Sequence, residues 1–255
     1  MDNQSISKAT ETIANASPDG YTLALVTAAN VISTILDDKL NFSFVRDAAP
    51  VAGISRNPFV MVVNPSIPAK AVPEFIAYAA ANPGKISMAS GGNGSILRFT
   101  GELFKMMTQL KIVHVPYEGG PPAVAALVSG HAQLMFATMP LAIQPIREGK
   151  LRALAVTTAM RSEVLPDVPT VSDFVPGYEA SGVQGLWAPK YTPPEIIDKL
   201  NRATNAALAD PKFKERLSEF GNTLLPGSTT EYRKAIETET EKWAKVVKFS
   251  GAKPD

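Results

Sequence analysis

Short apolar runs alternate along the chain with segments whose apolar residues recur at helical spacing. The runs have the length of buried strands, and the segments between them have the length of helices. This alternation predicts an α/β protein with a mainly parallel sheet that helices cover on both faces. The strands are expected at residues 21–27, 50–55, 59–64, 85–89, 112–116, 133–136, 151–157 and 185–189.

The C-terminal tail changes character and is helical in pattern throughout. Pro193 and Pro211 open two of its helices, at a position where the missing N–H of proline costs no hydrogen bond. The predicted helices of the whole chain are 72–81, 95–110, 121–129, 141–148, 193–208, 211–220 and 229–248.

Two extended segments predict crossings between two lobes. The strand at 59–64 runs into Pro65 and Pro68, and residues 185–189 lead to Pro193. Residues before proline avoid the helical region, so both segments are expected to be extended. We therefore expect two doubly wound lobes joined by two hinge strands. Lobe 1 comprises residues 1–64 plus 186–255 and lobe 2 comprises residues 65–185, with a ligand between them at the carboxyl ends of the strands.

Composition narrows the classes of partner. The chain of 255 residues can bury two modest cores. Its 25 basic and 24 acidic side chains are interspersed and give a formal charge of +1, which argues against a nucleic-acid partner. No cysteine is present, so disulfides and cysteine-ligated metals are excluded. No apolar run approaches the roughly 18 residues of a membrane span, and the polar start lacks the pattern of a secretion signal.

The turn Ser90-Gly91-Gly92-Asn93-Gly94-Ser95 follows a predicted strand and opens a predicted helix. Glycines let the backbone approach a ligand closely, and Asn93 or Ser95 can cap the first helical turn. Free N–H groups and the helix dipole at such an end favour an anion. The alternative is a tight turn that its own side chains cap. It is neither a dinucleotide fingerprint nor a phosphate loop.

Three further polar turns follow predicted strands. The first holds Thr27, Ala28 and Asn30, and an ordinary helix cap is its alternative interpretation. In a doubly wound arrangement all four turns can converge. The other two are Pro116-Tyr117-Glu118-Gly119-Gly120, where the Glu118 side chain is expected to face solvent, and Ala137-Thr138-Met139-Pro140.

Groups suited to catalysis are scarce. His114 and His131 are the only histidines, neither forms a metal-binding pair, and each is expected to be structural or on the surface. No nucleophile elbow is present. The adjacent carboxylates Asp37 and Asp38 are most simply solvated, and Arg152 and Arg161 could clamp a carboxylate. We expect no catalytic residue, no metal and no cofactor.

Several longer runs occur in a fixed order from Ser17 onward. They are Pro18-Asp19-Gly20-Tyr21-Thr22-Leu23, Ala89-Ser90-Gly91-Gly92-Asn93-Gly94-Ser95, Gly101-Glu102-Leu103-Phe104, Val115-Pro116-Tyr117, Gly149-Lys150-Leu151-Arg152-Ala153-Leu154-Ala155-Val156-Thr157, Leu165-Pro166-Asp167-Val168-Pro169-Thr170-Val171, Pro176-Gly177-Tyr178-Glu179 and Gly185-Leu186-Trp187-Ala188-Pro189.

In this order the runs make the chain similar to the substrate-binding proteins of the tripartite tricarboxylate transporter family, also called the Bug family of periplasmic receptors. The resemblance implies a type II periplasmic-binding-protein fold that closes on a small carboxylate, often a di- or tricarboxylate. It also implies a periplasmic location and delivery of the ligand to the membrane components of the transporter.

The resemblance also implies which residues hold the ligand. The family binds a carboxylate through N–H groups and hydroxyls at positions that here are Thr27, Ala28, Ser90, Asn93 and Ser95. Many members carry an aspartate for a ligand amine where this chain has Ala137, which favours a plain carboxylic acid. Together with the turns described above, the expected ligand-binding residues are Thr27, Ala28, Asn30, Ser90, Gly91, Asn93, Gly94, Ser95, Tyr117, Ala137 and Thr138.

One departure from the family pattern concerns the first lobe. Family members begin with a strand, a glycine-rich loop, a helix and a second strand that find no counterpart before residue 10 here. We therefore expect a first lobe truncated at its N-terminus. Two other functions stay open, a ligand-sensing domain of a regulatory protein and an enzyme acting on a small organic acid. A DNA-binding helix pair ahead of the sensor would indicate the former, and a perturbed acid or base in the cleft the latter.

Overall fold

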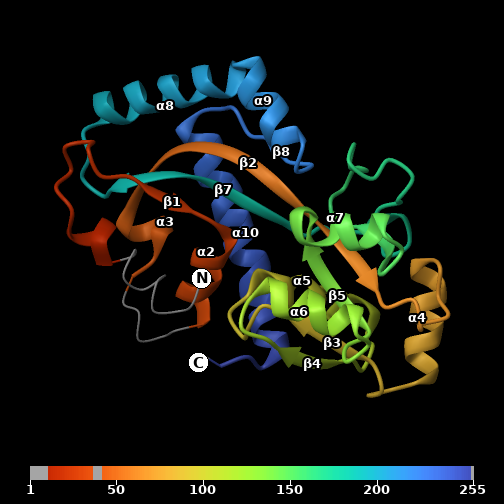
Figure 1. Cartoon of the computed structure of the whole chain (residues 1–255). Coiled ribbons are helices and arrows are strands. Elements are labelled where there is room, and N and C mark those ends of the chain that lie inside the picture. Colours follow the sequence, from red (N-terminus) through yellow and green to blue (C-terminus); the bar gives the residue numbers. More distant parts are fainter. Residues whose placement is uncertain (1–10, 37–41, 254–255) are drawn as a thin grey trace. The chain divides into compact units, whose positions relative to one another are not determined.

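The computed structural model describes residues 11–36 and 42–253 (Figure 1). The polar start of the chain and the carboxylates Asp37 and Asp38 lie outside these residues. The chain forms two compact units, the first from Met1–Asn57 with Gly182–Asp255 and the second from Pro58–Ser181. It passes between the units twice, in the strands β2 (Ala48–Val63) and β7 (Ser181–Pro189). The lobe boundaries expected from the sequence stay a prediction.

The first unit has an antiparallel sheet. β7 lies between β1 (Ala24–Val26) and β2, and it pairs antiparallel with β1. The two-residue strand β8 (Thr223–Leu224) pairs antiparallel with β2. The sheet of this unit is thus built from strands near both ends of the chain.

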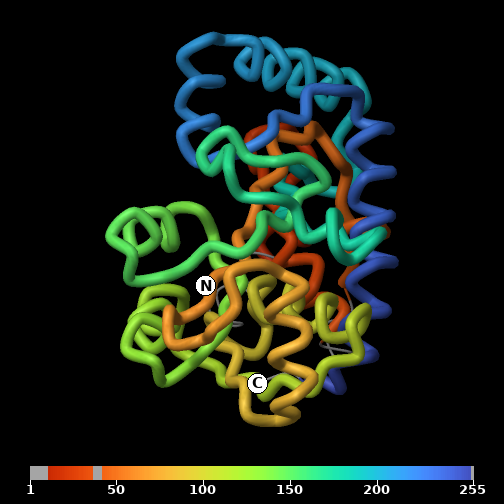
Figure 2. Tube along the Cα trace, turned by 90° about the vertical axis from the view of Figure 1, so that its right-hand side faces the viewer, coloured from red at the N-terminus to blue at the C-terminus, as the bar shows by residue number. Residues whose placement is uncertain are grey.

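Helices cover both faces of this first sheet. Side chains alternate along β7, so successive residues of the strand belong to two different cores. Val183 and Trp187 lie in the core formed with α2, α3 and α10, whereas Leu186 and Ala188 pack on the opposite face against α8. α10 is the long blue helix near the C-terminus in Figure 2. The helices of the unit are α2 (Ala28–Leu36), α3 (Phe44–Asp47), α8 (Pro194–Ala209), α9 (Pro211–Ser218) and α10 (Thr229–Ser250).

Local capping signals fix where these C-terminal helices begin. The Asp210 carboxylate accepts hydrogen bonds from the N–H groups of Lys212 and Phe213 at the start of α9. Ser228 and Glu231 form a capping box at the start of α10, in which each side chain accepts from the other residue's N–H. These contacts span three residues or fewer, so sequence patterns predicted the three tail helices closely.

The second unit has a mixed sheet. β3 pairs parallel with β4 on one side and with β5 on the other. β5 and β6 each pair antiparallel with the second half of β2. The further elements of the unit are β3 (Ser87–Ser90), β4 (Val113–Pro116), β5 (Leu134–Thr138), β6 (Arg152–Val156), α4 (Val72–Ala81), α5 (Ile96–Thr108), α6 (Gly120–Val128), α7 (Met139–Arg147) and a 3₁₀ turn at Val171–Asp173.

Helices cover both faces of this second sheet as well. Met135 and Ala137 of β5 belong to a core formed with α6 and α7. Phe136 points to the other face, where it lies 5.8 Å, centroid to centroid, from the ring of Phe104 in α5. The Phe104 ring lies in turn 6.3 Å from that of Phe75 in α4.

Three sequence-based expectations were wrong in detail. The strands expected at 50–55 and 59–64 are the single strand β2, whose pairing with β8 ends at Arg56 and whose pairing with β5 begins at Phe59. Pro58 lies where the strand changes partner, so its missing N–H removes no ladder hydrogen bond there. The sheet is mixed rather than mainly parallel. The helix α2 and the short elements α3 and β8 had no counterpart among the predicted elements.

Candidate functional site

Three parallel strands of the second unit end at one edge of its sheet. β4 ends at Pro116, β3 at Ser90 and β5 at Thr138, and Ser90 stands opposite Pro116 in the ladder. The Tyr117 N–H donates to the carbonyl oxygen of Ser90 at 2.9 Å, which continues the pairing beyond the strands. Each strand leads into a helix, so the N-termini of α5, α6 and α7 lie at this edge.

The turn between β3 and α5 is held by its own atoms. Ser95 is the N-cap of α5, and its Oγ accepts from the N–H of Leu97 at 3.2 Å. The Ser95 N–H donates to the carbonyl oxygen of Gly92 at 3.2 Å, and Gly92 adopts φ +122°. Residues that carry a side chain rarely adopt such a backbone conformation, so glycine is required at this point. The turn therefore has the capped geometry of the alternative interpretation, and its residues 91–96 are partly exposed.

The loop before α6 contacts this turn. A Cβ atom added at Gly91 would lie 3.2 Å from the carbonyl carbon of Gly119 and 3.3 Å from the nitrogen of Gly120. Gly119 adopts φ 98° and ψ 177°, a region that glycine alone occupies readily. The two glycine-containing loops are thus packed backbone to backbone, and their sequence separation hid this contact.

The α6 and α7 N-termini adjoin each other and differ in the donors they offer. A Cβ atom at Gly120 would collide with the side chain of Leu141 in the first turn of α7. Pro121 and Pro122 follow Gly120 and carry no N–H, so the first turn of α6 has a single donor. In α7, the Thr138 side chain makes no capping hydrogen bond. The Thr138 side chain therefore does not occupy the N–H groups of Met139 and Leu141 in the first turn of α7. Leu141 was absent from the sequence-based candidates because its proximity depends on the packing of α6 against α7.

Two side chains, the buried Arg98 and the half-buried His114, support the turn from beneath. Arg98 donates from Nη1 to the carbonyl oxygen and to Oδ1 of Asn93, at 3.1 and 3.2 Å. The Nε2 atom of His114 in β4 lies 2.6 Å from Oγ of Ser90. Burial, together with the charges of Arg98 and Lys105, lowers the pKa of His114 from 6.5 to about 4. The imidazole is therefore neutral at physiological pH. Sequence reasoning missed both supports, and only the basic Arg98 within the predicted helix could have signalled one of them.

The remaining predicted residues of this unit differ in exposure. Ser90 and Ala137 are each 0% exposed, backbone included, so neither residue presents an exposed group at this edge. Tyr117 is half-buried against the core below α6 and α7. Gly94 and Thr138 are partly exposed. Glu118 is exposed to solvent, as the sequence predicts.

The first unit carries the turn after β1. The Asn30 side-chain oxygen accepts from both the N–H and the hydroxyl of Thr27, at 2.9 and 2.8 Å. Thr27 is partly exposed, whereas Ala28 and Asn30 are buried. These bonds form a local cap at the start of α2, which corresponds to the alternative that the sequence left open.

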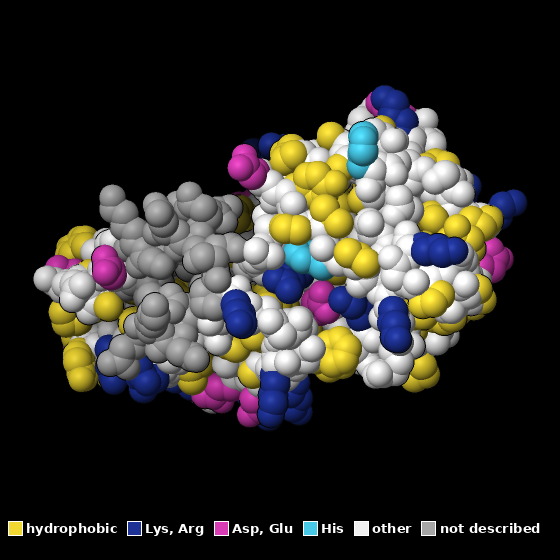
Figure 3. Space-filling model, turned by 90° about the horizontal axis from the view of Figure 1, so that it is seen from below, with side chains coloured by type: hydrophobic (Ala, Val, Ile, Leu, Met, Phe, Trp, Pro, Cys, Tyr) yellow, Lys and Arg dark blue, Asp and Glu magenta, His cyan; other side chains and the backbone are white. Residues whose placement is uncertain are grey.

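The other candidates have structural contacts. Arg152 donates from Nη1 to the carbonyl oxygens of Ile67 and Ala69, each at 2.9 Å. Arg161 donates to the carbonyl oxygen of Pro166 at 3.3 Å. On the face shown in Figure 3, lysine and arginine side chains are scattered among aspartate and glutamate and form no single basic field.

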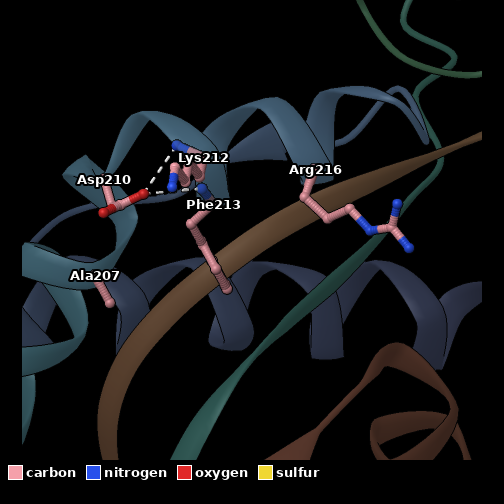
Figure 4. Close-up of a pocket in the computed structure, with 5 residues that line it drawn as sticks. All are labelled: Ala207, Asp210, Lys212, Phe213 and Arg216. Atoms are coloured by element: carbon pink, nitrogen blue, oxygen red, sulfur yellow. Dashed lines mark hydrogen bonds between the residues drawn. The ribbon is translucent and has the colours of Figure 1, made fainter.

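A separate open concavity lies along α8 and α9 (Figure 4). It contains none of the predicted site residues and is lined by Ala207, Asp210, Lys212, Phe213 and Arg216. Among residues 11–36 and 42–253, no group of three histidine, aspartate or glutamate side chains could hold a metal ion. Within the same ranges, no helix has both the length and the apolar character that crossing a bilayer needs.

The chain has two α/β units connected by two strands, and helices begin at a polar edge of the second unit's sheet. These features define a solute-binding receptor. The model of the tripartite tricarboxylate transporter family receptor matches residues 6–251, and the chain belongs to this family. The family and its structural relatives are receptors for solutes and not enzymes.

Relatives at about one-third identity cover almost the whole chain. Protein BugT of Bordetella pertussis (strain Tohama I) is 34% identical over 247 residues, which are 96% of this chain and 76% of BugT. The structure of R. palustris Rpa4515 with adipate matches with a TM-score of 0.85 at 31% identity, over 99% of this chain and 84% of that one. MatC (Rpa3494) from Rhodopseudomonas palustris with bound malate matches with a TM-score of 0.80 at 30% identity, over 94% and 84%.

Proposed function

We propose that this chain captures a small di- or tricarboxylate in the periplasm and delivers it to the membrane components of a tripartite tricarboxylate transporter. The observation that carries the proposal is the edge formed by β4, β3 and β5, where three helices begin beside a glycine-rich turn. Helix N-termini present N–H groups and a positive dipole end to an anion. Support comes from two relatives of similar fold whose structures hold adipate and malate.

The proposed contacts use donors that the fold leaves at this edge. Backbone N–H groups of Gly91, Gly94 and Met139 and the hydroxyls of Ser95 and Thr138 are suited to carboxylate oxygens. Charge-assisted hydrogen bonds of this kind are stronger than neutral ones. The half-buried Tyr117 and Asn93 are proposed to border the bound acid, and Ser90 and Ala137, each 0% exposed, to form the floor of the site beneath it. In the first unit, Thr27, Ala28 and Asn30 are proposed ligand contacts at the start of α2.

The acid itself is proposed to lack an ammonium group. Ala137 offers no carboxylate to an amine, and its side chain is fully buried. Glu118, the acidic side chain of the turn before α6, is exposed to solvent and is not among the proposed ligand contacts. With no carboxylate proposed to meet an amine, succinate is expected to bind more tightly than aspartate, which differs from it by one ammonium group.

The test is a thermal-shift and calorimetric screen of adipate, malate, succinate and citrate, with aspartate as comparison. A ligand at a hundred times its dissociation constant should add about 2.7 kcal/mol to the free energy of unfolding, which such a screen detects easily. A folded sample that none of these acids stabilises would contradict the proposal.

A matched pair of variants tests whether Thr138 belongs to the binding site. Thr138→Val removes a hydroxyl at the proposed site that makes no capping bond, so binding should weaken several-fold while the melting temperature stays constant. Thr223→Val makes the same exchange at an exposed position of β8 and should leave binding unchanged. Equal affinity in the two variants would remove Thr138 from the site.

A further inference from the structure

The Ser90 hydroxyl is saturated by three neighbours beneath the glycine-rich turn. Its Oγ lies 3.0 Å from the carbonyl oxygen of Gly92, 3.3 Å from the nitrogen of Gly92 and 2.6 Å from Nε2 of His114. A hydroxyl donates one hydrogen bond and accepts two. The Gly92 carbonyl can only accept and the Gly92 N–H can only donate. All three contacts are satisfied together when Nε2 of His114 carries the proton and donates to Ser90.

His114 reaches Ser90 because of the register between β4 and β3. His114 stands opposite Met88, two residues before Ser90, so all three side chains are directed to the α5 face of the sheet. In that position Met88 fills the space left by Gly101 of α5. The α5 helix also carries Arg98, Glu102 and Lys105, and Lys105 forms an ion pair of 2.9 Å with Glu102. A neutral imidazole fits beside these charges.

The Gly92 peptide is the group that this arrangement orients. Its carbonyl oxygen accepts from the Ser90 hydroxyl and also from the Ser95 N–H, at 3.0 and 3.2 Å. Both bonds hold the carbonyl within the turn. Without them, the peptide between Gly92 and Asn93 would rotate more easily, because no side chain at Gly92 restricts it, and would present its oxygen to the bound anion. A carbonyl oxygen facing a carboxylate would repel it.

We propose that His114 is a positioning residue for carboxylate binding, which donates from Nε2 to Ser90 and thereby keeps the Gly92 carbonyl turned away from the ligand. The proposal rests on the proposed function of this sheet edge. His114 itself touches no ligand. Its effect passes through one hydroxyl and one peptide group.

The experiment compares four single variants and the double variant His114→Leu with Ser90→Ala by calorimetry, with whichever of adipate, malate, succinate or citrate binds the wild-type protein. His114→Leu removes the donor, and Ser90→Ala removes the hydroxyl. His114→Gln keeps an N–H donor on its side-chain amide. His131→Leu is the matched control, because His131 also contacts a serine, Ser129, at 2.7 Å but is exposed beyond the C-terminal end of α6.

The expected results separate positioning from mere structural support. Loss of this part-buried hydrogen bond in the support should weaken binding about tenfold in His114→Leu and in Ser90→Ala. The double variant should be no weaker than either single variant by more than about twofold, because both act through the same hydroxyl. His114→Gln should recover most of the affinity even if its melting temperature resembles that of His114→Leu, and His131→Leu should bind as the wild type does. Additive losses, or wild-type affinity in a folded His114→Leu variant, would overturn the proposal.

A ligand-free measurement tests the inference even if no acid binds, an outcome that would defeat the proposed function alone. Nitrogen-15 NMR reports which imidazole nitrogen carries the proton, and amide hydrogen exchange reports the order of the turn. We expect His114 as the Nε2–H tautomer, and faster exchange at Gly92 and Ser95 in His114→Leu than in His131→Leu. A proton on Nδ1 alone, or unchanged exchange at both amides, would overturn the role of His114.

Discussion

Arg98 reaches back from the first turn of α5 and donates from Nη1 to both oxygens of Asn93, at 3.1 Å to the backbone oxygen and 3.2 Å to the side chain. The guanidinium is buried, with 9% of the residue exposed, and lies 5.5 Å from the centroid of the Phe99 ring. The end of the glycine-rich turn is thus tied to the helix that follows it. The same contact places a positive charge behind the proposed carboxylate site.

Replacing Arg98 should therefore weaken carboxylate binding. Arg98→Met keeps an apolar stem and removes the guanidinium, so we expect a loss of affinity of about tenfold or more, since hydrogen bonds to charged groups contribute about 1.5–3 kcal/mol. Calorimetric titration measures the effect. Arg147→Met, at the exposed C-terminal end of α7, is the control, and equal affinities in the two methionine variants would refute the role of Arg98.

The free energy of unfolding should depend on pH through His114. Burial and nearby cations lower the pKa of this imidazole from 6.5 to about 4 in the folded protein. Between these pH values the unfolded chain binds the proton and the folded chain does not, so stability rises with pH across the window. The contribution is fully present above pH 6.5 and is lost as the pH falls toward 4.

Urea unfolding of the wild type and of His114→Gln at several pH values measures this contribution. The difference between the two free energies should change across the window by less than about 1.4 kcal/mol per pH unit, the limit for one proton, since part of the imidazole reaches solvent. Parallel profiles from pH 6.5 to 4 would show that His114 does not titrate in this way.

A glycine at the junction of the two loops should be more critical for binding than a glycine elsewhere with positive φ. Gly119→Ala places a Cβ on a backbone with φ 98° and ψ 177°, which costs about 1–3 kcal/mol of strain or shifts the loop. Because Gly119 packs against Gly91, we expect weaker carboxylate binding together with lower stability.

Gly149→Ala provides the comparison for this prediction. Gly149 has φ +68° and nothing within 4 Å of an added Cβ, so its substitution should lower the free energy of unfolding and leave carboxylate binding unchanged. Thermal unfolding and calorimetry on both variants separate the two effects. Unchanged affinity in Gly119→Ala would argue against a site at this junction.

The core of the first unit depends on a buried hydrogen bond. Nε1 of Trp187 donates to the hydroxyl oxygen of Tyr232 at 2.9 Å, and the two residues are 0% and 4% exposed. Tyr232→Phe leaves the indole N–H buried without an acceptor, which should lower the free energy of unfolding by about 1–3 kcal/mol. Tyr191→Phe, at a residue that is 79% exposed, should change it by less than about 0.5 kcal/mol. Denaturant unfolding compares the two, and an equal effect would show that the indole N–H gains another partner.

Much of the local structure was encoded by short segments of sequence. Ser95 caps α5 through a bond to the N–H two residues ahead, and Ser228 with Glu231 starts α10 across three residues. Such signals act within one helical turn, so they are readable without knowledge of the fold. The glycines of the turn at Ser90–Ser95 predicted a tight strand-to-helix connection for the same reason.

Other features depended on which segments meet in space. Strand direction follows from pairing partners, and β2 exchanges β8 for β5 and β6 near Pro58, so the sequence pattern showed two strands where one exists. The side chain of Ala137 faces the core because β5 presents that position to α6 and α7. A strand alternates faces at every residue, and which face is covered is a property of the packed unit.

At the edge of the second unit's sheet, the sequence by itself predicted the three turns that follow β3, β4 and β5. That these turns bind an anion through helix N-termini stays a prediction. The tertiary structure alone decided that Gly91 packs on Gly119 and that Gly120 packs on Leu141. It also brought the imidazole of His114 to the buried hydroxyl of Ser90, 24 residues earlier. The physical reason is the parallel register of β3 with β4, which aligns residues far apart in the chain and which no local signal specifies.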